Sequence, residues 1–373
     1  PPGYTPQHWL GSEVVCEVDA DLARAESHLL VDEAWGKLAI MQLRTSTAQP
    51  KPWFVAVGFR RPHVPWVASK AAFARYQGQV HTPVHKQTLN AESNYFSWAQ
   101  VAGDIFTNTD DDHPERPQIP DFQANAFRRG YYASVTDVDE QVGALLDELV
   151  HLNVEDRTMV VLTADHGFAL GENNMWGKSG MVYEAAARVP LIIKVPWEDS
   201  SAGRRVQSVV ESVGIYDTLV SLAQLPRHPG LEGSSFAELL TQESEETVAN
   251  SKAFVQFVEP SINGGTLFGV RTHQWCYNEL YFGPPVWDTL ISPSLLHEQL
   301  HPTQDQLRGI ELFDCSDQDA SIYGFPNNLA VIHLDRYDDD IDHLAWLLRT
   351  NFKDLPSYDL VSLRNQTAWA SSP

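Results

Sequence analysis

One stretch, residues 157–178 (RTMVVLTADHGFALGENNMWGK), constrains the fold of this chain more than any other. It opens with Met159–Thr163, a short apolar and β-branched run between polar residues, which predicts a buried strand of a parallel sheet. Asp165, His166 and Gly167 follow that run directly. Because ligands of open α/β sheets bind beyond the carboxyl ends of the strands, we expect the chemistry of the protein at this point.

Asp165 and His166 place a carboxylate oxygen and an imidazole nitrogen side by side, which is half of a divalent-metal site. Lys178 returns a cation to the same stretch, and metal ligands near a cation suit an anionic ester such as a sulfate or a phosphate. An isolated Asp-His pair after a strand is more often a helix cap and a surface residue. On the pair alone, both interpretations stay open.

A second histidine also follows an apolar run. Trp53–Phe59 (WFVAVGF) predicts another buried strand, and it leads into residues 60–66 (RRPHVPW), which include His63. A histidine with a pKa near neutrality can hydrogen-bond an anion or pass a proton to a leaving oxygen. A histidine between prolines is, however, usually an ordinary loop residue.

Helical patterns surround these segments. Leu30–Leu43 and residues 121–150 have apolar residues at helical spacing, with Asp121 as the expected N-cap of the second helix. Val189–Pro196 predicts a further strand and Val213–Leu225 a further helix. The apolar stripe of the long helix, expected to pack against a sheet, consists of Tyr131, Val135, Val138, Val142, Leu145, Leu146 and Leu149.

The composition changes near residue 241. Residues 241–251 (TQESEETVANS) are acidic and polar and are expected to form a linker. After it, Ala253–Val258, Leu267–Tyr277 and Ile310–Phe313 predict strands of a small antiparallel sheet. We therefore expect a large domain over residues 1–240 and a C-terminal subdomain over residues 241–373.

Three cysteines are too few for a disulfide scaffold. Cys276 and Cys315 both lie in strand-like segments, so a disulfide between them and two reduced core cysteines are both open. Asn365-Gln366-Thr367 is a glycosylation sequon, which has meaning only in a secreted chain.

The formal net charge of −23 leaves no basic patch to neutralise phosphates, which excludes nucleic acid as an expected partner. No apolar run approaches the roughly 18 residues that a membrane-spanning helix needs. The chain opens with Pro1-Pro2-Gly3, without a Met or a signal peptide, which indicates a processed chain or a fragment.

The motifs together resemble a known family. A strand followed by Asp-His-Gly, Leu-Gly-Glu and Trp-Gly-Lys, here within residues 159–178, resembles the second metal-binding motif of the sulfatase family, in the alkaline-phosphatase-like superfamily. The segment 53–66 resembles the sulfatase segment that reads strand, Gly, then Arg/Lys-Pro-His-x-Pro, in the form nearest the iduronate 2-sulfatase branch. Asn173 departs from the pattern, since many members carry a histidine there, and this puts a secondary contact in doubt.

This resemblance implies an α/β fold: an alkaline-phosphatase-like sandwich with a mostly parallel sheet, lacking its N-terminal strands, plus a small C-terminal antiparallel α+β subdomain. It implies a sulfuric ester hydrolase that acts on a sulfated sugar or glycosaminoglycan, in the lysosome or outside the cell. Asp165 and His166 would bind one Ca²⁺. His63 and Lys178 would be the catalytic residues at the sulfate or its leaving oxygen, and Phe168 and Trp176 would contact the substrate with them.

The resemblance covers only the later part of a sulfatase. The family also needs an N-terminal strand that ends in paired metal-binding Asp residues, and a Cys-x-Pro/Ala-x-Arg segment whose cysteine becomes the formylglycine nucleophile. Cys16, Cys276 and Cys315 do not fit that segment. The resemblance therefore implies that this chain is inactive alone, either as a fragment or as a processed chain that pairs with an N-terminal chain of the same protein.

Two alternatives remain open. Asp-His-Gly is shared across the superfamily, so a phosphodiesterase or phosphonate hydrolase is possible, and the identity of the nucleophile would decide. A non-catalytic binding protein that keeps the scaffold is the other. Because loss of the first strands exposes sheet edges and apolar faces, a chain of this kind is expected to be unstable without its partner.

Overall fold

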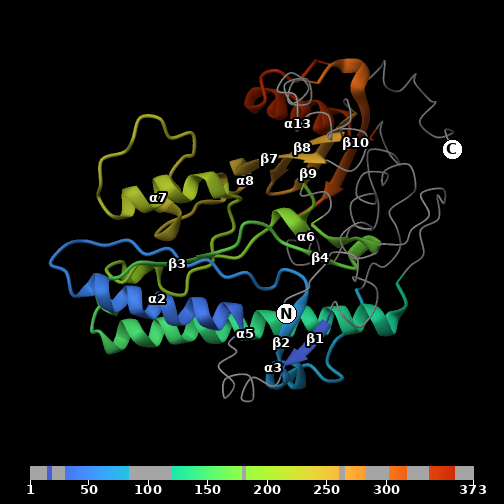
Figure 1. The fold of residues 1–373 in the computed structure, drawn as a ribbon. Helices are drawn as coiled ribbons and strands as arrows, with labels where there is room; N and C mark the ends of the chain where they lie inside the picture. The colour runs from blue at the N-terminus through green and yellow to red at the C-terminus, as the bar shows by residue number, and fades with distance from the viewer. Residues whose placement is uncertain are drawn as a thin grey trace, which may run out of the picture. The chain divides into compact units, whose positions relative to one another are not determined.

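The computed structural model describes residues 15–18, 30–83, 119–178, 182–259, 265–282, 302–316 and 336–357. The chain divides into two compact units. The first contains the two long helices of the N-terminal half, and the second contains the C-terminal sheet (Figure 1).

The first unit is built on two helices, α2 (Val31–Thr47) and α5 (Asp121–His151), which lie along each other (Figure 1). Both predicted helices are confirmed, and α2 runs one turn further than expected. The N-cap of α5 is Pro120, so the prediction of Asp121 as the cap is wrong: Asp121 is the first helical residue. A bidentate ion pair joins the helices, with Arg44 Nε and Nη2 at 2.8 Å and 2.9 Å from the Glu148 carboxylate.

The buried face of α5 differs from the predicted stripe. Leu149 is buried with Leu43 and Val154, as expected, but Val135 and Leu146 are 41% and 40% exposed. The small Ala133 is fully buried instead, because the middle of α5 packs closely against β2 (Trp66–Ser69) and α3 (Lys70–Arg75). Side-chain size at these close approaches, rather than apolar character alone, selects the face.

The paired strands in this region are short. β1 (Val15–Val18) pairs in parallel with β2, and β3 (Val160–Thr163) pairs with β6 (Leu191–Lys194), which confirms two predicted strands. They are less buried than predicted, since Leu162 is 37% and Ile192 is 60% exposed. A larger, mostly parallel sheet stays a prediction.

The predicted strand Trp53–Phe59 is wrong for the described residues. The segment is assigned to no strand, because no described strand pairs with its backbone. Trp53 and Val55 still pack with Leu43 and Val160, whereas Phe54 is 82% exposed. Side-chain burial therefore alternates along this run as it does in a strand, but the backbone forms no strand-to-strand hydrogen bonds with the described residues.

The second unit contains a four-stranded antiparallel sheet in the order β10-β9-β8-β7. This confirms the predicted C-terminal sheet. The strands are β7 (Lys252–Glu259), β8 (Gly265–Thr272), β9 (Trp275–Phe282) and β10 (Leu307–Asp314). The prediction of one strand over Leu267–Tyr277 is wrong, because this stretch contains parts of two antiparallel strands, β8 and β9, whereas β7 and β10 are longer than predicted. A disulfide joins Cys276 on β9 to Cys315 just beyond β10, which decides between the two alternatives for these cysteines.

The two faces of this sheet bury different partners. On one face, Phe268, Tyr281 and Leu312 pack against Ile341 and Leu348 of α13 (Asp338–Asn351). Residues of the opposite parity, including Leu267 and Phe313, form a second cluster with residues from segment 169–183. The sheet therefore has helix α13 on one side and the stretch after the Asp-His pair on the other.

Shorter elements complete the second unit. The predicted helix Val213–Leu225 is confirmed in shortened form as α7 (Ile215–Leu222). The segment 241–251, expected to be a linker, contains a short helix, α8 (Glu245–Asn250), whose N-cap Ser244 accepts from Thr247 N at 3.1 Å. The unit also contains β4 (Ala169–Leu170), β5 (Trp176–Gly177) and α6 (Glu184–Ala187). Among the described helices, none has the length and apolar character required to cross a membrane.

Candidate functional site

Asp165 and His166 lie just beyond the carboxyl end of β3, as predicted. The Asp165 side chain is 86% exposed and that of His166 is 21% exposed. Asp165 Oδ1 accepts a hydrogen bond from the His166 backbone N at 3.0 Å, and Asp165 Oδ2 lies 3.5 Å from His166 Nε2. The carboxylate and the imidazole therefore meet at one accessible point of the surface.

The surroundings of the His166 ring fix which nitrogen can bind a metal. Nδ1 lies 2.8 Å from the carbonyl oxygen of Gly167. A carbonyl only accepts, so in the neutral ring Nδ1 carries the proton and Nε2 presents its lone pair. Nε2 is also the nitrogen beside Asp165, so an oxygen and a nitrogen ligand point to the same place and fit a divalent metal.

The pair supplies only part of a ligand set. Within the described segments of the chain, no group of three or more His, Cys, Asp and Glu side chains is positioned to hold a metal ion. A carboxylate suits Ca²⁺ and Mg²⁺, whereas an imidazole suits transition metals as well, so two ligands do not select the ion.

A close backbone contact holds the loop of the pair. Gly167 N donates to Ala186 O at 2.7 Å. A Cβ atom on residue 167 would lie 2.3 Å from Ala185 O, so only glycine fits this approach. The turn after Asp165 and His166 therefore packs closely against Ala185 and Ala186 of α6.

The hairpin of β4 and β5 returns the chain toward the pair. Ala169 pairs with Gly177 and Leu170 with Trp176, and continuing this antiparallel register sets Lys178 opposite Phe168. Lys178 and Phe168 are both partly exposed. Among the described side chains, no carboxylate forms an ion pair with Lys178. The hairpin thus places Lys178 opposite Phe168, which lies two residues after His166.

Trp176 is placed differently from Phe168. It is 2% exposed, and its ring edge would contact a Cβ on Gly171, a residue with φ +104°. This burial indicates a packing role under the hairpin, so contact with substrate stays a prediction. Asn173 is 1% exposed at φ +49°, and the buried Glu172 carboxylate accepts from Leu170 N. The residues between β4 and β5 therefore form a tight, closed turn.

His63 lies in the first compact unit, in a tightly bonded loop. Its ring Nδ1 lies 2.7 Å from Val64 O, and its backbone N donates to Arg60 O at 3.0 Å. The side chain is exposed, and the argument used for His166 again leaves Nε2 as the available nitrogen. The peptide bonds Arg61-Pro62 and Val64-Pro65 are cis.

Asp32, which sequence reasoning missed, fixes the start of this loop. Its carboxylate accepts from Arg60 N at 2.6 Å and from Arg61 N at 3.2 Å, and it is 5% exposed. The sequence shows only an acid in the first turn of a helix, which is usually a solvated position. Its buried role becomes visible only when the fold brings residue 60 to it.

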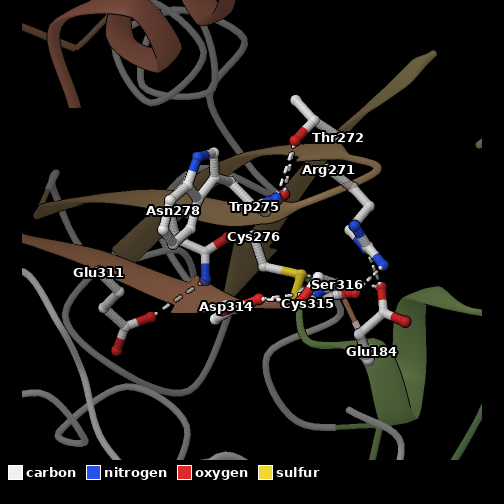
Figure 2. Close-up of a disulfide and its surroundings, with 10 residues drawn as sticks. All are labelled: Glu184, Arg271, Thr272, Trp275, Cys276, Asn278, Glu311, Asp314, Cys315 and Ser316. Carbon is white, nitrogen blue, oxygen red and sulfur yellow. Dashed lines mark hydrogen bonds and ion pairs between the residues drawn. A yellow bond between two sulfur atoms is a disulfide. The ribbon is translucent and has the colours of Figure 1, made fainter. Parts of the chain in front are cut away.

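A second missed group links the site to the C-terminal sheet. Glu184 on α6 accepts from Arg271 Nε at 2.8 Å, and Arg271 Nη2 donates to Cys315 O at 2.9 Å (Figure 2). Tyr183 donates to the Glu311 carboxylate, and burial raises the pKa of Glu311 to about 7. These partners are 87 and 128 residues apart in sequence, so no local pattern could have paired them.

Known proteins share sequence with this chain. The family model for Sulfatase matches residues 8–225, and the model for N-sulphoglucosamine sulphohydrolase, C-terminal, matches residues 171–293. Iduronate 2-sulfatase of Mus musculus is 28% identical over 290 residues, which cover 68% of this chain and 50% of that protein. The chain thus spans about half the length of the curated relatives it matches.

Solved structures share the fold. A phosphonate monoester hydrolase from Silicibacter pomeroyi has a TM-score of 0.65 at 20% identity, covering 94% of this chain and 67% of that one. A protein solved in complex with its substrate D-glucosamine-2-N,6-O-disulfate has a TM-score of 0.57 at 18% identity, covering 86% and 70%. At this identity the likeness shows the fold alone, and it confirms the predicted α/β, alkaline-phosphatase-like class.

Proposed function

This chain belongs to the sulfatase family, and we propose from that premise that it forms the metal-binding and sulfate-binding part of a sulfuric ester hydrolase. The observation that supports this most directly is the pairing of Asp165 with His166 Nε2, at 3.5 Å, beside the hairpin that returns Lys178. Two metal ligands next to a hairpin that returns a lysine suit an anionic ester.

Each residue has a separate role in this proposal. Asp165 and His166 hold one divalent metal, Ca²⁺ in the sulfatase resemblance, which when bound would polarise the oxygens of the sulfate group. The Lys178 ammonium pairs with a sulfate oxygen. His63 Nε2 holds or delivers the proton at the leaving oxygen of the sugar.

The nucleophile must come from elsewhere. Cys276 and Cys315 are joined in a disulfide, and Cys16 is followed by Glu-Val-Asp rather than by the formylglycine pattern. We therefore propose that a formylglycine and the remaining metal ligands are supplied by an N-terminal part of the same protein. The 373 residues alone are then expected to bind a sulfated ligand without turning it over.

The proposed substrate is a sulfated sugar, such as a glycosaminoglycan unit. Support comes from the similarity to iduronate 2-sulfatase and from the fold shared with a protein solved with a disulfated glucosamine. Phe168, partly exposed next to the pair, is the better placed of the two aromatic candidates to contact the sugar. Specificity for a 2-sulfated iduronate is the finest form of this proposal.

A compartment is also proposed. The disulfide between Cys276 and Cys315 favours an oxidising environment, which agrees with a lysosomal or secreted protein. The sequon at residues 365–367 lies outside the described residues, and its glycosylation stays a prediction, as does the domain boundary near residue 241.

Phosphonate or phosphate ester hydrolysis is the second candidate, because the fold of a phosphonate monoester hydrolase covers 94% of this chain. Calorimetry with the full chain in Ca²⁺ separates the two. We expect a sulfated disaccharide to bind more tightly than its desulfated form and than a phosphonate monoester, and Lys178→Met to weaken that binding about tenfold. A preference for the phosphonate would overturn the proposed sulfate-binding function, and so would sulfated-sugar binding that is unchanged in Asp165→Asn.

A further inference from the structure

Segment 182–187 occupies a central place in the second unit, between the Asp-His loop and the antiparallel sheet. Ala186 O accepts from Gly167 N, so α6 contacts the loop that carries Asp165 and His166. Tyr183 and Glu184, which precede this contact in the chain, both direct their side chains to the sheet. Neither has a role in the chemistry proposed above.

Glu184 is bound to the sheet through a buried ion pair. Its side chain is 8% exposed and that of Arg271 is 15% exposed, with Arg271 Nε 2.8 Å from Glu184 Oε1. The same guanidinium donates from Nη2 to Cys315 O at 2.9 Å, next to the disulfide with Cys276. Figure 2 shows Glu184 reaching Arg271 from outside the sheet. The planar guanidinium of Arg271 is thus held through both Nε and Nη2.

Tyr183 provides a second attachment. It is 2% exposed and packs with Leu267 and Phe313 in the cluster on one face of the sheet. Its hydroxyl lies 2.8 Å and 2.7 Å from the two oxygens of Glu311. Ala169 of β4 packs in the same cluster. The segment is therefore held by an apolar anchor and by two polar contacts, and has little freedom to shift.

We propose that Glu184 and Arg271 are positioning residues for the Asp165–His166 metal pair. The ion pair fixes α6 on the C-terminal sheet, Ala186 O fixes Gly167, and Gly167 O in turn orients the His166 ring through Nδ1. Through Arg271, the C-terminal sheet thereby sets the geometry of metal ligands that lie much earlier in the chain. This inference rests on the proposed metal site, and the tests separate the two.

The first test measures the loop without any metal. Amide hydrogen exchange of Gly167 in the full chain should become roughly tenfold faster in Glu184→Gln, because the contact with Ala186 O opens more often. Asp217→Asn is the matched control, since Asp217 is also a buried carboxylate paired with an arginine, Arg227 at 2.9 Å, in the same unit. The control should leave Gly167 exchange unchanged. Equal exchange in wild type and Glu184→Gln overturns the positioning role.

The second test uses Tb³⁺ as a luminescent probe for the metal site of the full chain. Glu184→Gln should weaken Tb³⁺ binding about tenfold, at the lower end of the effect of residues that orient metal ligands, whereas Asp217→Asn should not. Arg271→Lys, which keeps the charge but loses the fork, should give an intermediate loss, and it serves if Glu184→Gln does not fold.

The outcomes distinguish the two proposals. In one outcome, Tb³⁺ binding disappears in Asp165→Asn but is equal in wild type and Glu184→Gln. This result supports the proposed metal site and overturns the positioning role. A wild-type chain that binds no Tb³⁺, or binds it equally well as Asp165→Asn, overturns the proposed metal site itself. Equal weakening by Asp217→Asn would show a general loss of stability and also overturn the positioning role.

Discussion

The Tyr183 hydroxyl donates to the carboxylate of Glu311 and lies 2.8 Å and 2.7 Å from its two oxygens. Asn278 Nδ2 donates to the same carboxylate at 3.1 Å. Glu311 is 1% exposed, and none of the charged side chains in the described part of the chain forms an ion pair with it. An acid without a cation in an apolar sheet is a titrating group with consequences for stability.

Stability is predicted to fall as the pH rises through neutrality. Burial raises the pKa of Glu311 from 4.5 to about 7, while the hydrogen bonds from Tyr183 and Asn278 act in the opposite direction. Between these values the folded state holds a proton that the unfolded chain has released. The contribution of the protonated acid is therefore complete below pH 4.5 and is lost as the pH passes about 7.

Urea unfolding at pH 5 and pH 8 measures this contribution. The wild-type chain should lose about 2–3 kcal/mol of unfolding free energy over that interval from Glu311. Glu311→Gln keeps an acceptor for Tyr183 but does not titrate, so its loss should be smaller by that amount. An identical pH dependence in both proteins would show that Glu311 stays ionised in the fold.

Removal of the Arg349 cation is predicted to lower the free energy of unfolding strongly. Arg349 holds the fully buried Glu279 carboxylate with Nη1 at 2.7 Å and Nη2 at 3.0 Å. Arg349→Met leaves that charge unpaired and should cost about 3–5 kcal/mol in urea unfolding. Arg44→Met breaks the pair with Glu148 at a site where Arg44 is 59% exposed, and should cost far less. Similar losses from both variants would contradict the role given to burial.

Gly167→Ala is predicted to displace the Asp165–His166 pair. The added Cβ would lie 2.3 Å from Ala185 O, which is backbone and cannot rotate away. The variant should lose about 1–3 kcal/mol of stability and should bind Tb³⁺ more weakly. Gly143→Ala is the matched control: nothing lies within 4 Å of its Cβ in α5, so it should gain about 0.5–1 kcal/mol. Thermal unfolding of the two variants should shift in opposite directions.

Reduction of the disulfide is predicted to destabilise the sheet. Cys276 and Cys315 are separated by 39 positions, and the bond limits the unfolded chain between them. The double variant Cys276→Ser/Cys315→Ser should lose about 2–4 kcal/mol in urea unfolding. Equal unfolding midpoints with and without reductant in the wild-type chain would show that the bond adds nothing.

Local patterns in the sequence were enough to predict several parts of the fold. The helical spacing in residues 30–43 and 121–150, and the β-branched runs near Val160 and Leu191, each became the predicted element. The position of Asp165 and His166 just beyond the carboxyl end of β3 also follows from the strand that precedes them in the sequence. In each case the signal lies within a few residues of the feature it predicts.

Other features depend on contacts between distant residues. Trp53–Phe59 has the composition of a strand, but no described strand pairs with it. Amino-acid composition does not determine whether another strand lies close enough to form hydrogen bonds. The burial of Ala133 in place of Val135 depends on how closely a neighbouring element approaches. Glu184 with Arg271, and Tyr183 with Glu311, become partners only after the chain has folded.

The anchoring of Tyr183 in the C-terminal sheet bears on how such chains can diverge. Its ring packs with Leu267 and Phe313, and its hydroxyl binds Glu311, so residues before and after the acidic stretch 241–251 share one interior. An exchange of the C-terminal sheet between relatives would succeed only if the incoming sheet accepted this tyrosine. We therefore expect substitutions at Tyr183 and at the sheet residues that contact it to be coupled.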